Sequence, residues 1–326
     1  MNTKVFVTFL VLTILILSPI RVAADASSQV NLQDEGNAVS VTFASLGFTD
    51  SDLVGPLDGT RRVFSVPANW QVNPGSTVYL DFNVLLTGSD VGSVVGDTTT
   101  YAGTLTVLFN NKVLGYVQLD SSGSKTASFT IPAEAVTSIR ENGQHELSIQ
   151  LDAQLDCLDD VRTTVTVFST SRFDLLFDIT SPELNISRLP APFYLRNSLL
   201  PDTTLLVVSS QSTAEEMQAA INVMAGFGSL VGQTFNLSLI TDDKLTPELL
   251  ATSHLIFVGM PGKISVLEQV GFSVPIVGQQ FVGLPAESVE DGVLQMAHSP
   301  WNPNKVVLLV SGNSGLAVVK AAQAAG

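Results

Sequence analysis

The chain has 326 residues, of which 45% are hydrophobic and 14% are charged, a composition typical of globular domains and not of disordered chains. Its formal net charge is −15 and no cluster of Lys and Arg occurs, which argues against nucleic acid and anionic membrane surfaces as partners. Cys157 is the only cysteine, so a disulfide framework and a cysteine-based zinc site are excluded.

Residues 1–24 have the features of a secretory signal peptide. Lys4 supplies a positive charge, a mostly apolar run follows over residues 5–17, and Val22-Ala23-Ala24 provides small residues for cleavage after Ala24. The apolar run is shorter than the roughly 20 residues that a membrane-spanning helix needs. We expect an exported chain in the periplasm or at the extracellular face of the plasma membrane, with an uncleaved N-terminal anchor as the alternative.

Residues 38–181 carry the pattern of an all-β jelly-roll-like sandwich. Apolar and polar residues alternate over residues 77–86, and the alternation recurs over residues 105–109 and 146–152. Asn110-Asn111 lies between two such runs and predicts a tight hairpin, because asparagine tolerates positive φ. We expect about eight or nine strands, which suits a sandwich.

Residues 182–202 form a linker marked by prolines. The hydrophobic pattern of the sequence then changes over residues 203–326. Four short apolar runs predict strands, and the first of them, without alternation, has the pattern of a strand covered on both faces. These runs are residues 204–208, 237–240, 254–260 and 306–310.

Helices are predicted between and after these strands. The first begins at Ser212-Thr213, where Glu216 is placed to close a capping box, and it is predicted to end at Gly226-Phe227-Gly228. Its apolar residues at helical spacing are Met217, Ala220, Ile221, Met224 and Ala225. Further helices are expected over residues 246–252 and 316–325, and the alternation of strands and helices predicts an open parallel sheet.

Several segments together resemble a known family. They are residues 189–193, 200–208, 219–228 and 310–316, and the hairpin over residues 105–119. Together with the order of sandwich, linker and α/β domain, these segments resemble the N-terminal portion of the bacterial cellulose synthase regulatory subunit family. The resemblance consists of many weak matches over nearly the whole mature chain. The resemblance implies a jelly-roll-like sandwich followed by a flavodoxin-like α/β domain.

The resemblance also implies partners. Members of the family assist, outside the cytoplasm, the membrane glycosyltransferase that polymerises UDP-glucose, repeat the pair of domains and end in a transmembrane anchor. It implies a membrane cellulose synthase catalytic subunit and a glucan polymer as partners, with membrane association through the synthase or through a C-terminal anchor absent here. The chain is then a fragment of a longer protein or a short divergent relative.

The family is often labelled cyclic-di-GMP-binding, and the residues do not support that label. A ligand with two phosphates favours arginines, and Arg61-Arg62 is the only adjacent arginine pair. The pair stands beside a strand beginning at Val63, which predicts a solvated strand edge.

Neither catalytic residues nor cofactor or metal ligands are predicted. The turn over residues 209–213 lacks the glycine that often shapes a flavin-phosphate loop. Ser314 resembles the serine of a nucleophile elbow, but no Asp or His follows it. The three histidines, His145, His254 and His298, lack metal-ligand spacing.

Exposed aromatic side chains are the candidate carbohydrate contacts, because sugar rings stack their C–H faces on aromatic planes. The candidates are Trp70, Tyr79 and Tyr101, with core packing as the alternative for each. The favoured function is a non-catalytic accessory subunit of a cellulose or exopolysaccharide synthase, which guides nascent glucan and docks the glycosyltransferase. The alternatives are a secreted carbohydrate-binding protein without a synthase partner and an exported hydrolase.

Overall fold

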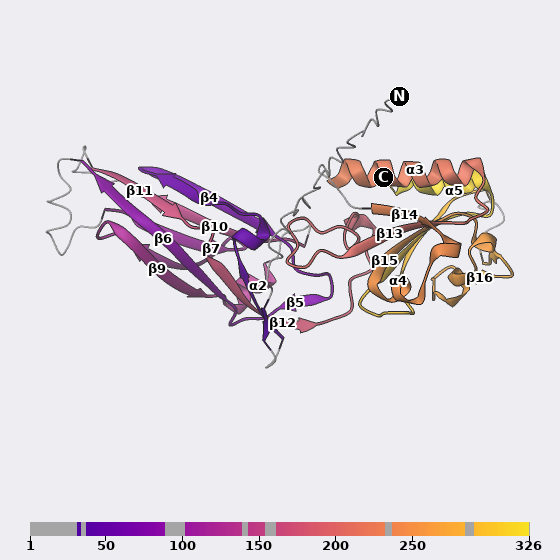
Figure 1. The fold of residues 1–326 in the computed structure, drawn as a ribbon, viewed down its shortest axis with the longest axis horizontal. Helices are drawn as coiled ribbons and strands as arrows, with labels where there is room; N and C mark the ends of the chain where they lie inside the picture. Colours follow the sequence, from indigo (N-terminus) through magenta and orange to yellow (C-terminus); the bar gives the residue numbers. More distant parts are fainter. Residues whose placement is uncertain are drawn as a thin grey trace, which may run out of the picture.

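The computed structural model describes residues 31–33, 37–88, 102–138, 143–153, 161–231, 237–283 and 290–325. Over these residues the chain forms a β-sandwich and an α/β part that lie end to end (Figure 1). The predicted leader, Tyr101 and Cys157 lie outside the described residues. Within the described ranges, no helix has both the length and the apolar character that crossing a membrane requires.

The larger sheet of the sandwich has the order β1-β2-β12-β6-β11-β3, with β9 paired to β6 and β5 paired to β12. Its strands pair antiparallel throughout. The bounds are β1 (Asn31–Gln33), β2 (Ala38–Thr42), β3 (Ser51–Val54), β5 (Trp70–Val72), β6 (Thr77–Thr87), β9 (Gly123–Thr130), β11 (Arg162–Val167) and β12 (Arg172–Ile179).

The smaller sheet is also antiparallel and has the order β4-β10-β7-β8. Its strands are β4 (Leu57–Phe64), β7 (Thr104–Phe109), β8 (Lys112–Gln118) and β10 (His145–Asp152), and the short helix α2 (Ala133–Thr137) precedes β10. Asn110 and Asn111 connect β7 to β8 with φ values of 47° and 63°, which confirms the predicted hairpin.

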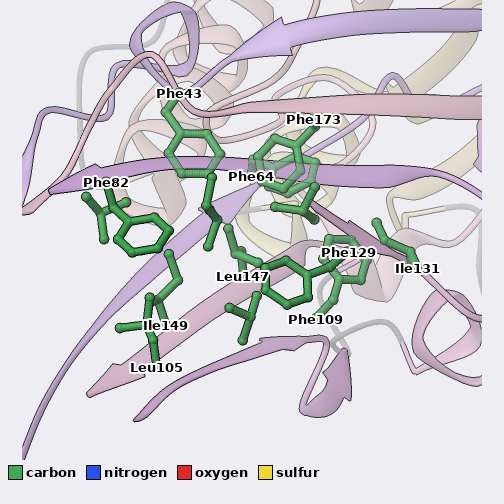
Figure 2. Packing of buried hydrophobic residues seen from close by; sticks show 14 of the residues in the cluster. Phe43, Phe64, Phe82, Leu105, Phe109, Phe129, Ile131, Leu147, Ile149 and Phe173 are labelled. Carbon is green, nitrogen blue, oxygen red and sulfur yellow. The ribbon is translucent and has the colours of Figure 1, made fainter. Parts of the chain in front are cut away.

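One hydrophobic core joins the two sheets. Figure 2 shows Phe64 and Phe109 of the smaller sheet close to Phe173 of the larger one, and the rings of Phe64 and Phe173 lie 4.6 Å apart. The inward residues alternate with polar ones, as the sequence predicts. The sheets have eight and four strands, more than expected, because β1, β3 and β5 are too short to show a period of two.

The α/β part holds a five-stranded sheet of order β14-β13-β15-β19-β18. Four strands run parallel, and β18 pairs antiparallel with β19, which corrects the expected all-parallel sheet. The bounds are β13 (Thr203–Val208), α3 (Ala214–Val231), β14 (Leu237–Thr241), α4 (Pro247–Thr252), β15 (Ser253–Val258), β16 (Ile276–Val277), β17 (Gln280–Phe281), β18 (Val293–His298), β19 (Val306–Ser311) and α5 (Gly315–Ala324).

Helices α3 and α5 lie side by side on one face of this sheet (Figure 1). The other face is covered by α4 and by segments after β15, which include the 3₁₀ helices η4 (Pro261–Lys263) and η5 (Ser265–Gln269). Cores therefore form on both faces, and β15 and β19 are buried along their whole length. This explains why these strands are apolar without alternation.

Two expectations for α3 are wrong. The helix continues through Gly226-Phe227-Gly228 to Val231, because the ring of Phe227 is fully buried against the sheet and its packing outweighs the helix-breaking tendency of glycine. The face that packs is Glu216, Ala219, Ala220, Val223 and Phe227, whereas Met217, Ile221 and Met224 are exposed.

The linker contacts both parts of the chain. Ser65 and Ser198 form an isolated parallel bridge, and the Asn197 side chain donates a hydrogen bond of 2.9 Å to the Val63 carbonyl oxygen. Phe193 packs edge-on against Phe227 in the α/β core. The linker is therefore an ordered connection between the sandwich and the α/β part.

Candidate functional site

Trp70 lines a hollow where the sandwich meets the linker. The strand β5 holds the indole parallel to the ring of Phe177, with ring centres 3.6 Å apart. The hollow has a volume of about 260 Å³. Its apolar walls come from the sandwich and from the linker, and they include Val66, Pro67, Ala68, Val72, Ala191, Pro192 and Leu195. One face of Trp70 is thus occupied by packing, and the side chain also borders an opening at the junction.

Polar groups stand around this hollow. Arg188 and Glu183 form an ion pair of 2.5 Å, and Asn185 caps the 3₁₀ helix η2 (Ile186–Arg188) by accepting from the Ser187 N–H. His145 forms part of the wall, and burial lowers the pKa of this imidazole to about 4, so it is neutral at pH 7. The hollow therefore combines one aromatic plane with polar groups at its border.

The Asn110 side chain fixes the position of His145. Its amide nitrogen donates to the Ala135 carbonyl oxygen (2.8 Å) and lies 3.0 Å from Nδ1 of His145. Its amide oxygen accepts from the Glu146 N–H at 2.9 Å. With the amide nitrogen as the donor, Nδ1 of the neutral imidazole is the acceptor and the proton is on Nε2.

Tyr79 lies on the outer face of the larger sheet, as its strand phase predicts. The guanidinium of Arg172 lies over the ring, 4.0 Å from its centre, and Arg172 also pairs with Asp174 at 3.3 Å. One ring face of Tyr79 is therefore covered by a cation and is closed to a sugar unless Arg172 moves.

The structure does not bring Trp70 and Tyr79 together. Trp70 pairs with Ile179 and Tyr79 pairs with Arg172, at opposite ends of β12. Seven residues along a strand correspond to about 23 Å, and an odd spacing puts the two side chains on opposite faces. Tyr101 lies outside the described residues, so the three predicted contacts do not form one site here.

Open α/β sheets bind ligands at the edge formed by the carboxyl ends of the parallel strands. The site lies between the two neighbouring strands at which the strand order reverses. Here the turn after β13 and the turn after β15 meet at Glu216, whose side chain is fully buried. Glu216 Oε1 accepts from the Met260 N–H at 2.8 Å, and Oε2 accepts from Lys263 Nζ at 2.6 Å. A carboxylate of the chain itself therefore stands in the crevice.

Glu216 also closes the predicted capping box. Its Oε2 accepts from the Thr213 N–H at 2.7 Å, and the Thr213 hydroxyl accepts from the Glu216 N–H at 3.3 Å. Burial acts to raise the pKa of Glu216, but the hydrogen bonds from Lys263, Met260 and Thr213 outweigh it and hold the pKa below its ordinary value. A ligand phosphate at this turn would face a fixed negative charge.

Ser314 caps α5. Its Oγ accepts from the Ala317 N–H at 3.2 Å, and its hydroxyl donates to Glu290 Oε2 at 3.4 Å. These contacts place Ser314 at the N-cap of the helix, in the turn that follows β19. Among the described residues, none of the contacts of Ser314 involves a histidine that could act as its general base.

The arginine pair on β4 is only partly the solvated edge that was predicted. The strand is an edge of the smaller sheet and the Arg61 side chain is 73% exposed, but Arg62 is buried. The Arg62 guanidinium donates to the Thr49 carbonyl oxygen at 2.8 Å and lies over the ring of Phe48. Successive residues of a strand point to opposite faces, so the pair does not form one cationic site.

The sequence interpretation missed Tyr116, the one described aromatic side chain that is largely exposed, at 65%. It lies on the outer face of the smaller sheet, where residues of β4, β7 and β10 line a further hollow. The sequence carries no signal for it, because the two-residue Asn110-Asn111 turn alone would put Tyr116 opposite the buried Leu105.

Comparisons with known proteins give one family match. Residues 185–325 match the family model described as cellulose synthase BcsB, first FD domain. No curated protein matches the chain.

Two solved structures of esterases show a distant likeness. The first is a family two carbohydrate esterase from Clostridium thermocellum in complex with cellohexaose, with 10% identity, a TM-score of 0.18, and coverage of 65% of this chain and 61% of that one. The second is an acetyl xylan esterase from the rumen bacterium Butyrivibrio proteoclasticus, with 9% identity, a TM-score of 0.17, and coverage of 82% and 85%. Such TM-scores carry no argument about fold or activity, whereas the match over residues 185–325 supports membership of this chain in the cellulose synthase BcsB family.

Proposed function

We propose that the chain is a non-catalytic, extracytoplasmic accessory subunit of cellulose synthase, which guides nascent glucan and docks the membrane catalytic subunit. The observation that carries the proposal is the match of residues 185–325 to the first FD domain of BcsB. The α/β part supplies the docking platform, and the sandwich supplies the glucan contact. The domain limits of 38–181, 182–202 and 203–326 and export through residues 1–24 belong to the same proposal.

The arrangement of polar groups supports a non-catalytic role. Ser314 caps a helix, Glu216 is held by three donors in the sheet crevice, and His145 is buried with its Nδ1 against Asn110. Each of these groups is engaged in structure. The flavodoxin-like description of the α/β part is also proposed, on the order of its four parallel strands, with β18 as the departure.

The Trp70 hollow supports the guiding role. Its aromatic plane and polar border suit a ligand that presents both C–H faces and hydroxyl groups. The hollow borders the ordered linker, so a chain held there would pass between the two parts. Stacking tolerates sliding better than a fixed network of hydrogen bonds, and a growing polymer must slide.

The test is co-expression with a membrane cellulose synthase catalytic subunit, followed by detergent co-purification and measurement of glucan formed from UDP-glucose. We expect the chain to co-purify, and we expect Trp70→Ala to lower glucan output without loss of co-purification. Ile179→Ala is the matched control, because Ile179 is the exposed cross-strand neighbour of Trp70 outside the hollow.

Failure to co-purify, with the chain folded, would contradict the accessory-subunit proposal. If that chain still bound cello-oligosaccharides, the secreted carbohydrate-binding alternative would replace it. If Trp70→Ala and Ile179→Ala gave the same glucan output as the unchanged chain, the guiding role of the hollow would be wrong.

A further inference from the structure

The outer face of the smaller sheet is hollowed. The depression has a volume of about 530 Å³ and lies over β4, β10 and β7. Its polar lining residues include Asp58, Arg61, Thr106, Ser148, Gln150 and Asp152. This face is distinct from the Trp70 hollow and from the face that carries Tyr79.

The strand register aligns a row of residues across this face. Gln150 of β10 pairs with Gly59 of β4 on one side and with Thr106 of β7 on the other, and Thr106 pairs with Tyr116 of β8. Directly paired residues point to the same face. At about 4.8 Å between strands, the row from Gly59 to Tyr116 is about 14 Å long, longer than one pyranose ring.

A β-bulge brings Tyr116 to this face. Phe109 and Leu108 pair with Lys112 and Val113 in the register of a two-residue turn, and the register then shifts between Val107 and Leu108. Without the shift, Tyr116 would stand opposite Leu105, which is fully buried in the core. With the shift, Tyr116 stands opposite Thr106 and is 65% exposed.

Glycines lie at both ends of this row, Gly59 at one end and Gly115 next to Tyr116 at the other. A Cβ at Gly115, in the bulged segment, would lie 3.0 Å from the ring of Phe129, a tight contact that favours a residue without a side chain here. Gly59 lies on the outer face at the far end of the row, and a side chain there would stand in the hollow. Because Gly59 has no side chain, the floor of the hollow beside Gln150 is open.

The charges around the hollow are mainly negative. Asp58 accepts from the N–H groups of Val54 (2.9 Å) and Gly59 (2.7 Å), which hold its pKa below the ordinary value and keep it ionised. Asp152 adds a carboxylate, and Arg61 faces Glu146 at 3.9 Å. Asp58 pairs with the buried Leu151, so its carboxylate belongs to the other side of the strand. On the outer face, the two carboxylates of Asp152 and Glu146 against one guanidinium disfavour a phosphate or a polyuronate.

We propose that this face, from Gly59 to Tyr116, binds an extended chain of neutral β-linked glucose. In such a chain all hydroxyls are equatorial, so each ring has a flat C–H face for the Tyr116 ring and a hydroxyl edge for Gln150 and Arg61. The inference rests on the proposed glucan contact of the sandwich and names the surface that makes it.

The test titrates cellohexaose into the full-length chain and its variants and follows binding by NMR. Tyr116→Ala weakens binding about five- to tenfold, because the stacking plane is lost, while Tyr116→Phe stays within about twofold of the unchanged chain. Gln150→Ala weakens binding about threefold through the loss of a polar contact. Tyr79→Ala is the matched control on the other sheet and leaves binding unchanged, and circular dichroism checks that each variant is folded.

Several outcomes would overturn the inference. If Tyr116→Ala bound cellohexaose as well as the unchanged chain while Trp70→Ala did not, the face would be wrong and the proposed function would stand. If the folded, unchanged chain did not bind cellohexaose at all, the inference would fail, and co-purification with the synthase would still decide the docking role. Tighter binding of an oligoglucuronate or of an oligolysine peptide would show that a charged ligand occupies the face instead.

Discussion

In the sandwich, the outer faces of both sheets carry polar residues that meet water, whereas the sheet of the α/β part is covered on both faces. The sandwich leaves a hollow of about 530 Å³ beside the exposed Tyr116. The α/β part places the buried Glu216 carboxylate at the edge where its fold class takes ligands. The sandwich therefore offers surface to a ligand, and the α/β part uses its polar groups for its own stability.

This difference assigns roles to the two parts. A polymer contact requires an accessible, elongated and polar surface, which the smaller sheet of the sandwich has. A docking platform requires rigidity, which two packed cores and a closed crevice provide. The chain also contains only two tryptophans, Trp70 in the sandwich and Trp301 in the α/β part, so single Trp→Phe backgrounds report on each part separately.

The largest expected effect is the loss of the Glu216 carboxylate. Glu216→Ala lowers the free energy of unfolding of the α/β part by about 3–5 kcal/mol, because it leaves Lys263 and two partly buried N–H groups without their acceptor. Urea denaturation followed by Trp301 fluorescence in a Trp70→Phe background measures it. Glu215→Ala is the matched control and changes stability by at most about 0.5 kcal/mol.

Lowering the pH should remove the stabilisation that the Glu216 carboxylate provides. Because the folded pKa of Glu216 is lowered, its stabilisation is present above the ordinary value of 4.5 and is lost as the pH falls through the folded pKa. An unchanged Trp301 transition in Glu216→Ala would contradict the role of this carboxylate in closing the crevice.

In the sandwich, the free energy of unfolding falls at a higher pH than in the α/β part, because of His145. Its pKa in the folded chain is about 4, against an ordinary value of 6.5, because burial disfavours the charged form. The unfolded chain takes up the proton first, so the sandwich loses up to about 3 kcal/mol as the pH falls from 6.5 to 4. Trp70 fluorescence in a Trp301→Phe background measures the slope.

His145→Gln is the variant that sharpens this prediction. The glutamine oxygen can accept from Asn110, as Nδ1 does, but it does not titrate. We expect the slope between pH 6.5 and 4 to flatten in this variant. A slope equal to that of the unchanged sandwich would assign the acid sensitivity to another group.

A smaller loss follows from Asn110→Ala. The substitution removes partners of the Ala135 carbonyl oxygen and the Glu146 N–H, and it puts alanine at a φ of 47°. We expect the sandwich to lose about 2–3 kcal/mol in urea denaturation. Asn111→Gly, at the neighbouring position with positive φ and an exposed side chain, should change stability by less than about 0.5 kcal/mol.

The smallest effect is expected at Ser314. Ser314→Ala removes the cap of α5 and costs the α/β part about 1 kcal/mol, since it loses the hydrogen bond from the Ala317 N–H and a long, exposed one to Glu290. Complementation of glucan synthesis should remain intact. A loss of complementation at unchanged abundance would contradict the non-catalytic interpretation of this part.

Much of the fold could be predicted from local pattern. The alternation in β6, the Asn110-Asn111 turn and the capping box at Thr213 each depend on residues close in sequence, and the structure confirms them. In β10 the burial alternates only over residues 149–152, because Glu146 and Ser148 are buried as well. The predicted end of α3 at Gly226–Gly228 is wrong because the burial of Phe227 is a tertiary effect.

The candidate contacts were harder to predict, because they depend on register and on partners far away in the sequence. Tyr116 is exposed through a one-residue bulge, in a segment where Gly115 lies close to Phe129 of another strand. The phase of Tyr79 was predictable, but the Arg172 guanidinium that covers its ring comes from another strand. The stacking of Trp70 on Phe177 likewise joins distant segments.

The most direct test of this division of roles is a map of amide chemical-shift changes over the full-length chain with added cellohexaose. The account predicts shifts on β4, β10, β7 and β8 around Tyr116, with additional shifts at the Trp70 hollow if it guides the chain. It predicts no shifts at the turns over residues 209–213 and 312–315 of the α/β part. Shifts confined to those two turns, with the sandwich unaffected, would contradict the claim that the sandwich contacts the glucan.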